Sequence, residues 1–479
     1  MSIASNLARV TTLAVGIAGA LAIGDANAAA FQLKENSAKG LGRAFAGSTS
    51  AWDDASVVAT NPASMRLLDG RQFQADLSLI SFSAEIKQYD GRNSNGTPIS
   101  GGDGGDAGMI APVPAAYFHV PFGENDNMHF GLSLSVPFGF KTEYDRDWVG
   151  RYHGVTTDLK AIDLGAAFSY DVNPYVSFGA SVFVEHLTIE ISNALDMGSV
   201  INGQAQANAV AQLLRANPAA TPAQIAGVRG QAAQGAAAQG FFPGSADGFV
   251  TIEGDSNALG YTLGTTLSPS EDTNIAFTYR SKVEHKITGG TANFTVPANV
   301  GVALGQPASG LFVDTHGKAT LTLPASASVS VTHRVNDRWT IMGDVSRTAW
   351  KTAFDQVVVQ FDSNQPDSVL SFQYDDTTFG SIGAEYKMSD TITLRGGVAY
   401  DETPTSYAHR DVRVPDVTRK WLSLGLGWTP SENTEFNFGY THLFTNEPAI
   451  NVTSATGNVL QGKYDVGGDI LAASINYKF

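Results

Sequence analysis

The chain has 479 residues, no cysteine and a formal net charge of −16 at pH 7. The lack of cysteine excludes a disulfide framework and a thiolate metal site, and the negative charge argues against a nucleic-acid partner. Fifty glycines and 26 phenylalanines, with only 16% charged residues, favour aromatic-rich β-structure.

The first 28 residues have the pattern of an export signal. Arg9 is followed by an apolar run over 10–23 and then by Ala26-Asn27-Ala28, a small-residue cleavage pattern, so we expect residues 1–28 to be a signal peptide. No later stretch approaches the roughly 18 consecutive apolar residues of a membrane-spanning helix. No linker or shift in composition divides the rest of the chain, which predicts one large closed unit.

Residues 29–70 precede the first clear strand-like segment, 73–86, and show little alternation. Within them, Asn61-Pro62-Ala63 predicts the start of a short helix, because an Asn side chain can cap free amides and Pro fits the first helical position. A segment of small side chains without alternation cannot span lipid. It therefore lies in the periplasm or fills a lumen.

Apolar and polar residues alternate along the remaining chain, clearly so over 129–136, 162–170, 421–428 and 469–479. Every second position is apolar, whereas the positions between them are rich in glycine and serine. A soluble β-sandwich also alternates, but it seldom gives its polar face so many glycines and serines over strands this long. The pattern predicts strands with lipid on one face and a lumen on the other.

Short turns and long loops alternate strictly between these strands. The turns lie at 123–127, 172–174, 269–272, 336–337, 389–390 and 431–433, and the loops near 89–112, 145–156, 193–248, 289–317, 351–373, 403–418 and 448–463. These six turns and seven loops connect fourteen strands. An even strand number, with turns at one end and loops at the other, is typical of outer-membrane barrels, where closure satisfies every backbone group.

We therefore predict an all-β protein, a 14-stranded antiparallel transmembrane β-barrel over residues 71–479, in the outer membrane of a Gram-negative bacterium. Such a barrel is too wide for its own side chains to fill. Residues 29–70 are not committed to the wall or the outer loops, so we expect them to form a hatch, or plug, in the lumen. Interfacial girdles are expected from aromatic residues near strand ends, some of which instead pack in loops: Tyr144, Trp148, Tyr175, Trp339, Trp350, Trp421 and Trp428.

The segment AAFQLKENSAKGLGRAFAGSTSAWDDASVVATNPASM, residues 29–65, resembles the N-terminal hatch of the FadL-type outer-membrane transporters for long-chain fatty acids. The likeness continues through 157–165, 277–289 and 414–428, and so over almost the whole mature chain. The resemblance implies a 14-stranded barrel blocked by the hatch. It also implies that a hydrophobic ligand is captured between two long loops, passes to an inner pocket, and leaves sideways through a break in the third strand.

Loop 193–248 supplies one side of the expected capture groove. Thr221, Pro222 and Gln224 stand at the positions of a capping box, which predicts a helix start there. An apolar stripe on a preceding helix fits either capture or packing on the barrel rim. The resemblance assigns the groove to Val210, Leu213 and Leu214 of this loop and to Phe294, Leu311 and Phe312 of the facing loop 289–317.

We assign the inner pocket to Phe31, His186 and Arg395. Phe31 resembles the hatch residue that reaches into the ligand site. His186 stands where the family has an arginine, and this departure leaves open whether the ligand is a carboxylate, which a buried cation would bind, or an uncharged molecule.

Three arginines, Arg280, Arg347 and Arg395, are further candidates for binding a ligand carboxylate, and a lumen arginine is more often an ion-pair partner for the hatch. Arg280 and Arg395 fall on the polar faces of their strands, whereas Arg347 falls with apolar residues. The expected partners on the hatch are Glu35, Asp53 and Asp54.

The lateral exit is assigned to Pro137, Phe138 and Gly139 in the third strand. Pro137 lacks the N–H that a ladder needs and Gly139 offers no packing, so regular pairing should fail there. A harmless bulge is the alternative.

These observations favour passive uptake of long-chain fatty acids or similar hydrophobic molecules by a monomer whose partners are the ligand and outer-membrane lipid. The first alternative is the same mechanism for monoaromatic or other uncharged hydrocarbons. No catalytic motif, cofactor site or metal site is recognised, so we do not expect an enzyme. A general diffusion porin and an outer-membrane lipid hydrolase are the competing classes.

Overall fold

The computed structural model describes residues 32–479, so the predicted signal peptide and Phe31 lie outside the described part. Nineteen strand segments form one sheet that closes on itself where β1 pairs with β19. Five consecutive pairs of segments continue one another, β7 with β8, β9 with β10, β11 with β12, β13 with β14 and β17 with β18, so the wall has fourteen antiparallel strands. The predicted barrel is confirmed.

The strand segments are β1 (Gln72–Arg92), β2 (Ile110–Phe122), β3 (Met128–Glu143), β4 (Thr156–Asn173), β5 (Val176–Asp196), β6 (Asp247–Ser270), β7 (Thr273–Arg280), β8 (Val283–Thr295), β9 (Thr315–Leu323), β10 (Ser326–Arg334), β11 (Trp339–Thr348), β12 (Gln356–Phe361), β13 (Ser368–Ser371), β14 (Thr377–Lys387), β15 (Ile392–Asp401), β16 (Arg419–Ser431), β17 (Thr434–Phe444), β18 (Ala449–Thr453) and β19 (Val459–Lys478). The helices are α2 (Ala38–Leu41), α3 (Val57–Thr60), α4 (Met197–Ala216), α5 (Pro222–Ala238) and α6 (Ala298–Ala303), with short 3₁₀ helices η1 (Pro62–Leu67), η2 (Glu124–Asp126) and η3 (Trp350–Thr352). Among residues 32–479, no helix is long and apolar enough to cross a membrane.

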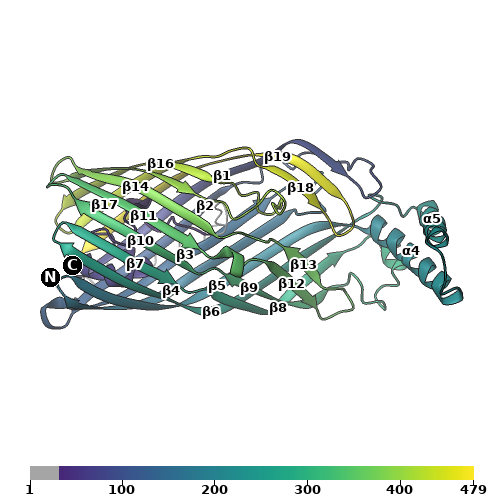
Figure 1. Cartoon of the computed structure of the whole chain (residues 1–479), viewed down its shortest axis with the longest axis horizontal. Coiled ribbons are helices and arrows are strands. Elements are labelled where there is room, and N and C mark those ends of the chain that lie inside the picture. Colours follow the sequence, from purple (N-terminus) through teal and green to yellow (C-terminus); the bar gives the residue numbers. More distant parts are fainter. Residues whose placement is uncertain (1–31) are drawn as a thin grey trace.

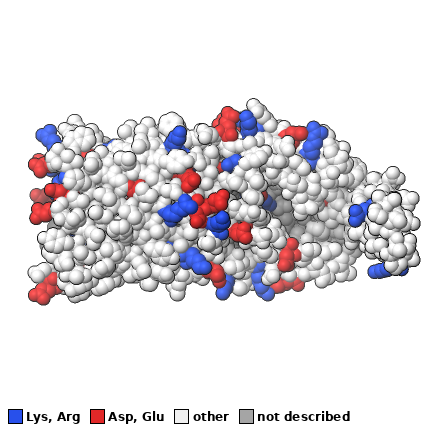
Figure 2. Space-filling model, viewed as in Figure 1, with Lys and Arg blue, Asp and Glu red and all other residues white. Residues whose placement is uncertain are grey.

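Short turns gather at one end of the barrel and the long loops, with α4 and α5, extend beyond the other end (Figure 1). The outward faces follow the predicted alternation: Leu422, Leu424 and Leu426 of β16 are exposed, whereas Ser423 between them is buried. Figure 2 shows a band almost free of charged residues between the turn end and the middle of the barrel. Such a band is what contact with lipid acyl chains requires.

The predicted aromatic girdle is confirmed in part. Tyr175, Trp339 and Trp428 are exposed near strand ends. The other four residues of the set, Tyr144, Trp148, Trp350 and Trp421, are at most 4% exposed and belong to interior clusters. Trp421 turns inward because it occupies the lumen register of β16, one position before outward-facing Leu422.

Residues 38–68 occupy the lumen as three short helical turns joined by tight loops. Glycines allow the hatch and the wall to approach closely. A Cβ added to Gly42 of the hatch would lie 2.8 Å from the Cα of Gly425 in β16, and one added to Gly264 in β6 would lie 1.8 Å from the Asn61 side chain. Larger residues would separate hatch and wall. The many lumen-facing glycines therefore provide a docking surface for the hatch.

Candidate functional site

A cavity of about 140 Å³ lies between the hatch and one side of the barrel wall. Its lining from the hatch comprises Gln32, Leu33, Lys34, Asn36, Phe45, Ser48, Thr49, Ala59 and Thr60. Its lining from the wall comprises Ser135, Val136, Pro137, Phe138, Thr262, Thr278, Arg280, Ser326, Ser328, Asp344, Ser346 and Phe379. Apolar side chains, hydroxyls and two cations thus share one chamber, which we call the hatch cavity.

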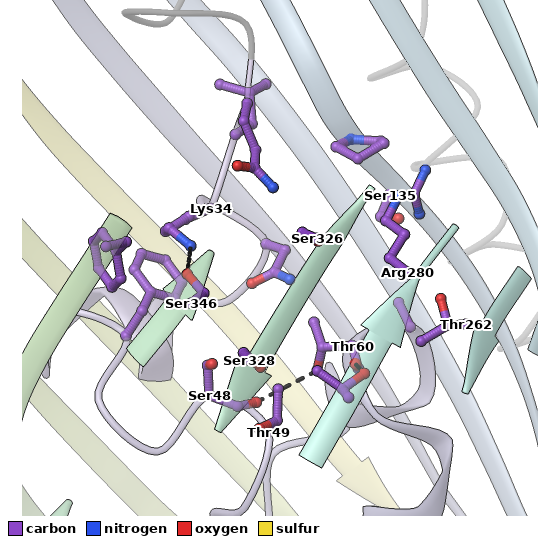
Figure 3. A pocket seen from close by; sticks show the side chains of 18 of the residues that line it. Lys34, Ser48, Thr49, Thr60, Ser135, Thr262, Arg280, Ser326, Ser328 and Ser346 are labelled. Carbon is purple, nitrogen blue, oxygen red and sulfur yellow. Dashed lines mark hydrogen bonds between the residues drawn. The ribbon is translucent and has the colours of Figure 1, made fainter. Parts of the chain in front are cut away.

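The two cations approach the hatch cavity from opposite sides in Figure 3, with Ser326 of β10 between them. Arg280 at the end of β7 forms two ion pairs, because its guanidinium lies 2.7 Å from Asp163 Oδ2 and 2.7 Å from Glu185 Oε2. Lys34 instead donates to the hydroxyl of Ser346 at 3.2 Å. The cations therefore differ in how much of their charge is already neutralised.

The third strand, β3, loses its regular pairing beside this cavity. Pairing with β2 ends at the pair Ala116 and Leu134, and the register with β4 shifts between Ser135 and Phe138. Side chains alternate between exposed and buried up to Leu134, but beyond it nearly all are buried on both faces. This half of β3 thus turns away from lipid and toward the interior, at the residues where the sequence predicted a break.

The start of the described chain lies along this interruption. The amide of Leu33 donates to the carbonyl of Pro137 at 2.8 Å, and Gln32 pairs antiparallel with Phe138. A Cβ on Gly139 would meet the Leu33 side chain at 3.1 Å. Residues 32 and 33 therefore act as a short substitute strand on the open edge of β3.

Asn61-Pro62-Ala63 forms the predicted capped turn. The Asn61 side chain accepts from the amide of Ala63 and donates to the carbonyl of Thr49 at 3.1 Å and to the hydroxyl of Ser64 at 3.0 Å, while Pro62 begins η1. Because Asn61 is fully buried and also meets the hydroxyl of Thr266 in β6, this turn fixes the hatch to the wall.

Charged residues anchor the other side of the hatch. Arg43 is fully buried and donates to Glu385 Oε1 at 2.7 Å and to Asp54 Oδ2 at 3.3 Å. Burial by itself raises the pKa of Asp54, but Arg43, Lys39 and the hydrogen bonds from Ser56 and Ser37 together outweigh burial and hold that pKa below its ordinary value. Burial raises the pKa of Glu35, which lies next to Lys34.

Two predicted pocket residues lie elsewhere. His186 is exposed on the outer face of β5, where its Nδ1 lies 3.0 Å from Asn257 Oδ1, because the inward positions of this strand belong to Glu185 and Leu187. The assignment of His186 to an inner pocket is therefore wrong. Arg395 does face the lumen, but it does not line the hatch cavity.

Arg395 instead belongs to the ion-pair network under the hatch. Its guanidinium donates to Glu385 at 2.8 Å, to Asn437 at 2.8 Å and to Glu435 at 3.4 Å. Arg347 lies on the outer face, 56% exposed, as its register with apolar residues predicted. Arg280 and Arg395 are therefore both held by carboxylates, and Lys34, which lines the hatch cavity, was not singled out from the sequence.

The capture loops contact each other beyond the barrel. Phe294 and Phe312 meet edge to face with centroids 5.9 Å apart, and Phe312 packs against an apolar cluster built from Met197 and Ile201 of α4 and Val300 of α6. Leu311 is half-buried beside Phe312. Val210, Leu213 and Leu214 lie further along α4, half-buried or exposed, and do not join this cluster.

A row of potentially catalytic side chains crosses the outer face, but its order is unsuitable. Asp469 of β19 pairs in register with Ser81 of β1 on one side and His442 of β17 on the other, and His442 Nδ1 lies 2.9 Å from Asp469 Oδ1. A hydrolase needs the histidine between the serine and the carboxylate. Here the carboxylate lies between the other two groups.

The fold and the cavity together define a class of protein, an outer-membrane β-barrel whose lumen is closed by a hatch beside an interrupted strand. The model of the family described as outer membrane protein transport protein (OMPP1/FadL/TodX) matches residues 19–479, and the chain belongs to this family. The predicted family and its location in the Gram-negative outer membrane are confirmed.

Individual relatives span nearly the whole chain. Outer membrane protein P1 of Haemophilus influenzae is 29% identical over 433 residues, which cover 88% of this chain and 87% of the relative. The long-chain fatty acid transport protein of Escherichia coli is 28% identical over 447 residues, or 92% and 93% of the two chains.

Solved structures agree with this relationship. A Pseudomonas aeruginosa FadL homologue has a TM-score of 0.81 at 25% identity, covering 94% of this chain and 100% of that one. The Ralstonia pickettii toluene transporter TbuX shares the fold, with a TM-score of 0.59 at 19% identity and coverage of 91% and 96%.

Proposed function

We propose that the chain takes up long-chain fatty acids or similar hydrophobic molecules across the outer membrane without an energy source and without catalysis. The observation that carries this proposal is the hatch cavity, which adjoins both the plug and the unpaired edge of β3. A relative that shares 28% identity is named a long-chain fatty acid transport protein. Ligand would be captured among the apolar residues of loops 193–248 and 289–317 and would then reach the hatch cavity.

Lateral release is the second part of the proposal. The edge of β3 beyond Leu134 has lost β2 as a partner and is covered by Gln32 and Leu33. If these two residues move away, an opening bordered by Pro137, Phe138 and Gly139 connects the hatch cavity with the membrane. Phe31, which precedes them, is proposed to contact the ligand and to link its arrival to this movement.

A disulfide tests lateral release. Gln32 and Phe138 are directly opposed in an antiparallel bridge, a spacing of about 4.5 to 5.5 Å between Cα atoms that a disulfide can span. The chain has no other cysteine, so a Gln32→Cys and Phe138→Cys pair can be oxidised selectively. Uptake of radiolabelled oleate into cells should stop on oxidation and return on reduction. Equal uptake in both states would disprove release through this edge.

A monoaromatic hydrocarbon is the second candidate substrate, and the size of the hatch cavity favours it. The cavity of about 140 Å³ is close to the roughly 150 Å³ that accommodates a benzene molecule in an engineered protein core. Binding of radiolabelled oleate and toluene to the purified barrel distinguishes the two. Saturable binding of neither ligand would refute the transport proposal as a whole.

A further inference from the structure

Lys34 presents a cation to the hatch cavity from the hatch side. Its ammonium group donates to the Ser346 hydroxyl at 3.2 Å and lies 4.1 Å from the centroid of the Phe379 ring. An ammonium has three N–H donors, and these two contacts leave donor capacity unused. Figure 3 shows the side chain at the edge of the cavity, bent toward β11.

The charge of Lys34 has no carboxylate partner at ion-pair distance. Among residues 32–479, no carboxylate oxygen lies within 4.0 Å of its Nζ. Glu35, its neighbour in the chain, turns its carboxylate back to accept the Lys34 backbone amide at 2.9 Å. Asp344 also lines the cavity, but its carboxylate accepts the hydroxyl of Ser48 at 2.8 Å.

Arg280, on the opposite side of the same cavity, differs from Lys34 because carboxylates compensate its charge. Its guanidinium has two carboxylates at 2.7 Å, so two anions already compensate its charge. Lys34 has no carboxylate of the described chain at that distance. It therefore gains more from an anionic ligand than Arg280 does, because charge-assisted hydrogen bonds are stronger than neutral ones.

The surroundings of Lys34 also fit an amphiphile. The ring of Phe379 lies directly beside the ammonium, and Phe45 and Leu33 of the hatch line the same cavity. An anionic head group at Lys34 would therefore leave the first carbons of its chain against apolar side chains.

We propose that Lys34 is the specificity-determining residue for the ligand head group and that it selects a carboxylate over an uncharged group of the same chain length. This inference rests on the proposed transport function. Because Lys34 lies one residue beyond the pair Gln32 and Leu33, a head group bound there contacts the same segment that covers the open edge of β3.

Matched ligands test the proposal. Binding of oleate and of oleyl alcohol, which share one hydrocarbon chain, is measured on the purified full-length barrel in detergent at about pH 9, where the free carboxylate is ionised. The variants are Lys34→Met, Lys34→Arg, which keeps the charge, and Lys87→Met, which removes an exposed charge that does not line the hatch cavity. Migration of unheated and heated protein on a gel verifies that each barrel is folded.

The wild type should prefer oleate to the alcohol by about ten- to a hundredfold, as expected for a hydrogen bond to a charged group. Lys34→Met should reduce this ratio to about one and leave the affinity for the alcohol unchanged, while Lys34→Arg and Lys87→Met should retain the preference. A Lys34→Met barrel that still prefers oleate overturns the inference, as does a wild type that binds both equally; transport of hydrophobic ligands would then still stand. Absence of any lipid binding to the wild type would refute the proposed function and this inference together.

Discussion

Replacing Arg43 by methionine should release the hatch. The Arg43 side chain is completely buried and bridges Asp54 of the hatch and Glu385 of β14, at 3.3 and 2.7 Å. Methionine fills similar space but carries no charge. Asp54 would then keep hydrogen bonds from Ser37 at 2.9 Å and Gln74 at 3.2 Å but would lose its ion-pair partner, and its buried charge would be compensated only by the more distant Lys39.

The magnitude follows from burial. Removing one partner of a buried ion pair costs about 3 to 5 kcal/mol, because the other charge remains desolvated. Glu385 keeps its contact with Arg395 at 2.8 Å and is 21% exposed, so the lower value, about 3 kcal/mol, applies. A change of that size reduces the ratio of docked to undocked hatch by about two orders of magnitude.

Single-channel recording in planar bilayers measures the undocked fraction, since an empty lumen of fourteen strands conducts ions. The control is Arg66→Met, which removes a half-buried hatch arginine that, among the described residues, donates only to two backbone carbonyls, those of Asn173 and Pro174. Arg43→Met should show frequent open events, and Arg66→Met should stay as quiet as the wild type. A folded Arg43→Met barrel that remains closed would refute the claim that this ion pair holds the hatch.

Three further changes have defined outcomes. Gly264→Ala places a Cβ 1.8 Å from the Asn61 side chain and should lower the yield of folded barrel or raise its conductance, whereas Gly467→Ala, with nothing within 4 Å, should do neither. Burial raises the pKa of Glu35, so the stability linked to its protonation is complete below its unfolded pKa and is lost as the pH rises through the folded value. Glu35→Gln should therefore raise the denaturant midpoint more at about pH 8 than at about pH 4, and an equal effect at both would contradict this linkage. Phe312→Ala removes a ring from the cluster that joins the capture loops and should weaken apparent affinity in uptake assays severalfold while leaving the maximal rate unchanged.

The wall was predictable because each strand carries its own period-two pattern. Leu422, Leu424 and Leu426 face outward as alternation requires, and the same rule placed Arg347 on the outer face. Local capping signals were equally reliable: Asn61 caps η1 and Thr221 begins α5 with a complete capping box. These features depend on neighbouring residues alone.

The site was less predictable, because it depends on contacts between distant segments. His186 was assigned by its place in a family motif, although alternation with Glu185 already put it on the outer face. Arg395 faces the lumen, as expected. Its carboxylate partner Glu385 also binds Arg43 of the hatch, and such a shared ion pair cannot be read from one strand. No pattern in the sequence distinguishes Lys34 from other lysines. Its place in the cavity lining becomes visible only when the preceding residues, which pair with β3, are seen in the structure.

The first helix of the hatch docks on strands from the end of the chain, which bears on the order in which the barrel and the hatch assemble. Helix α2, the first helix of the described chain, packs against β16, β17 and β19, and a Cβ on its C-terminal Gly42 would touch the backbone of Gly425. These strands are synthesised last, so the earliest segment finds its seat only when the end of the chain has arrived. A barrel without these strands therefore lacks the docking surface for α2 as well as the strand that closes the cylinder.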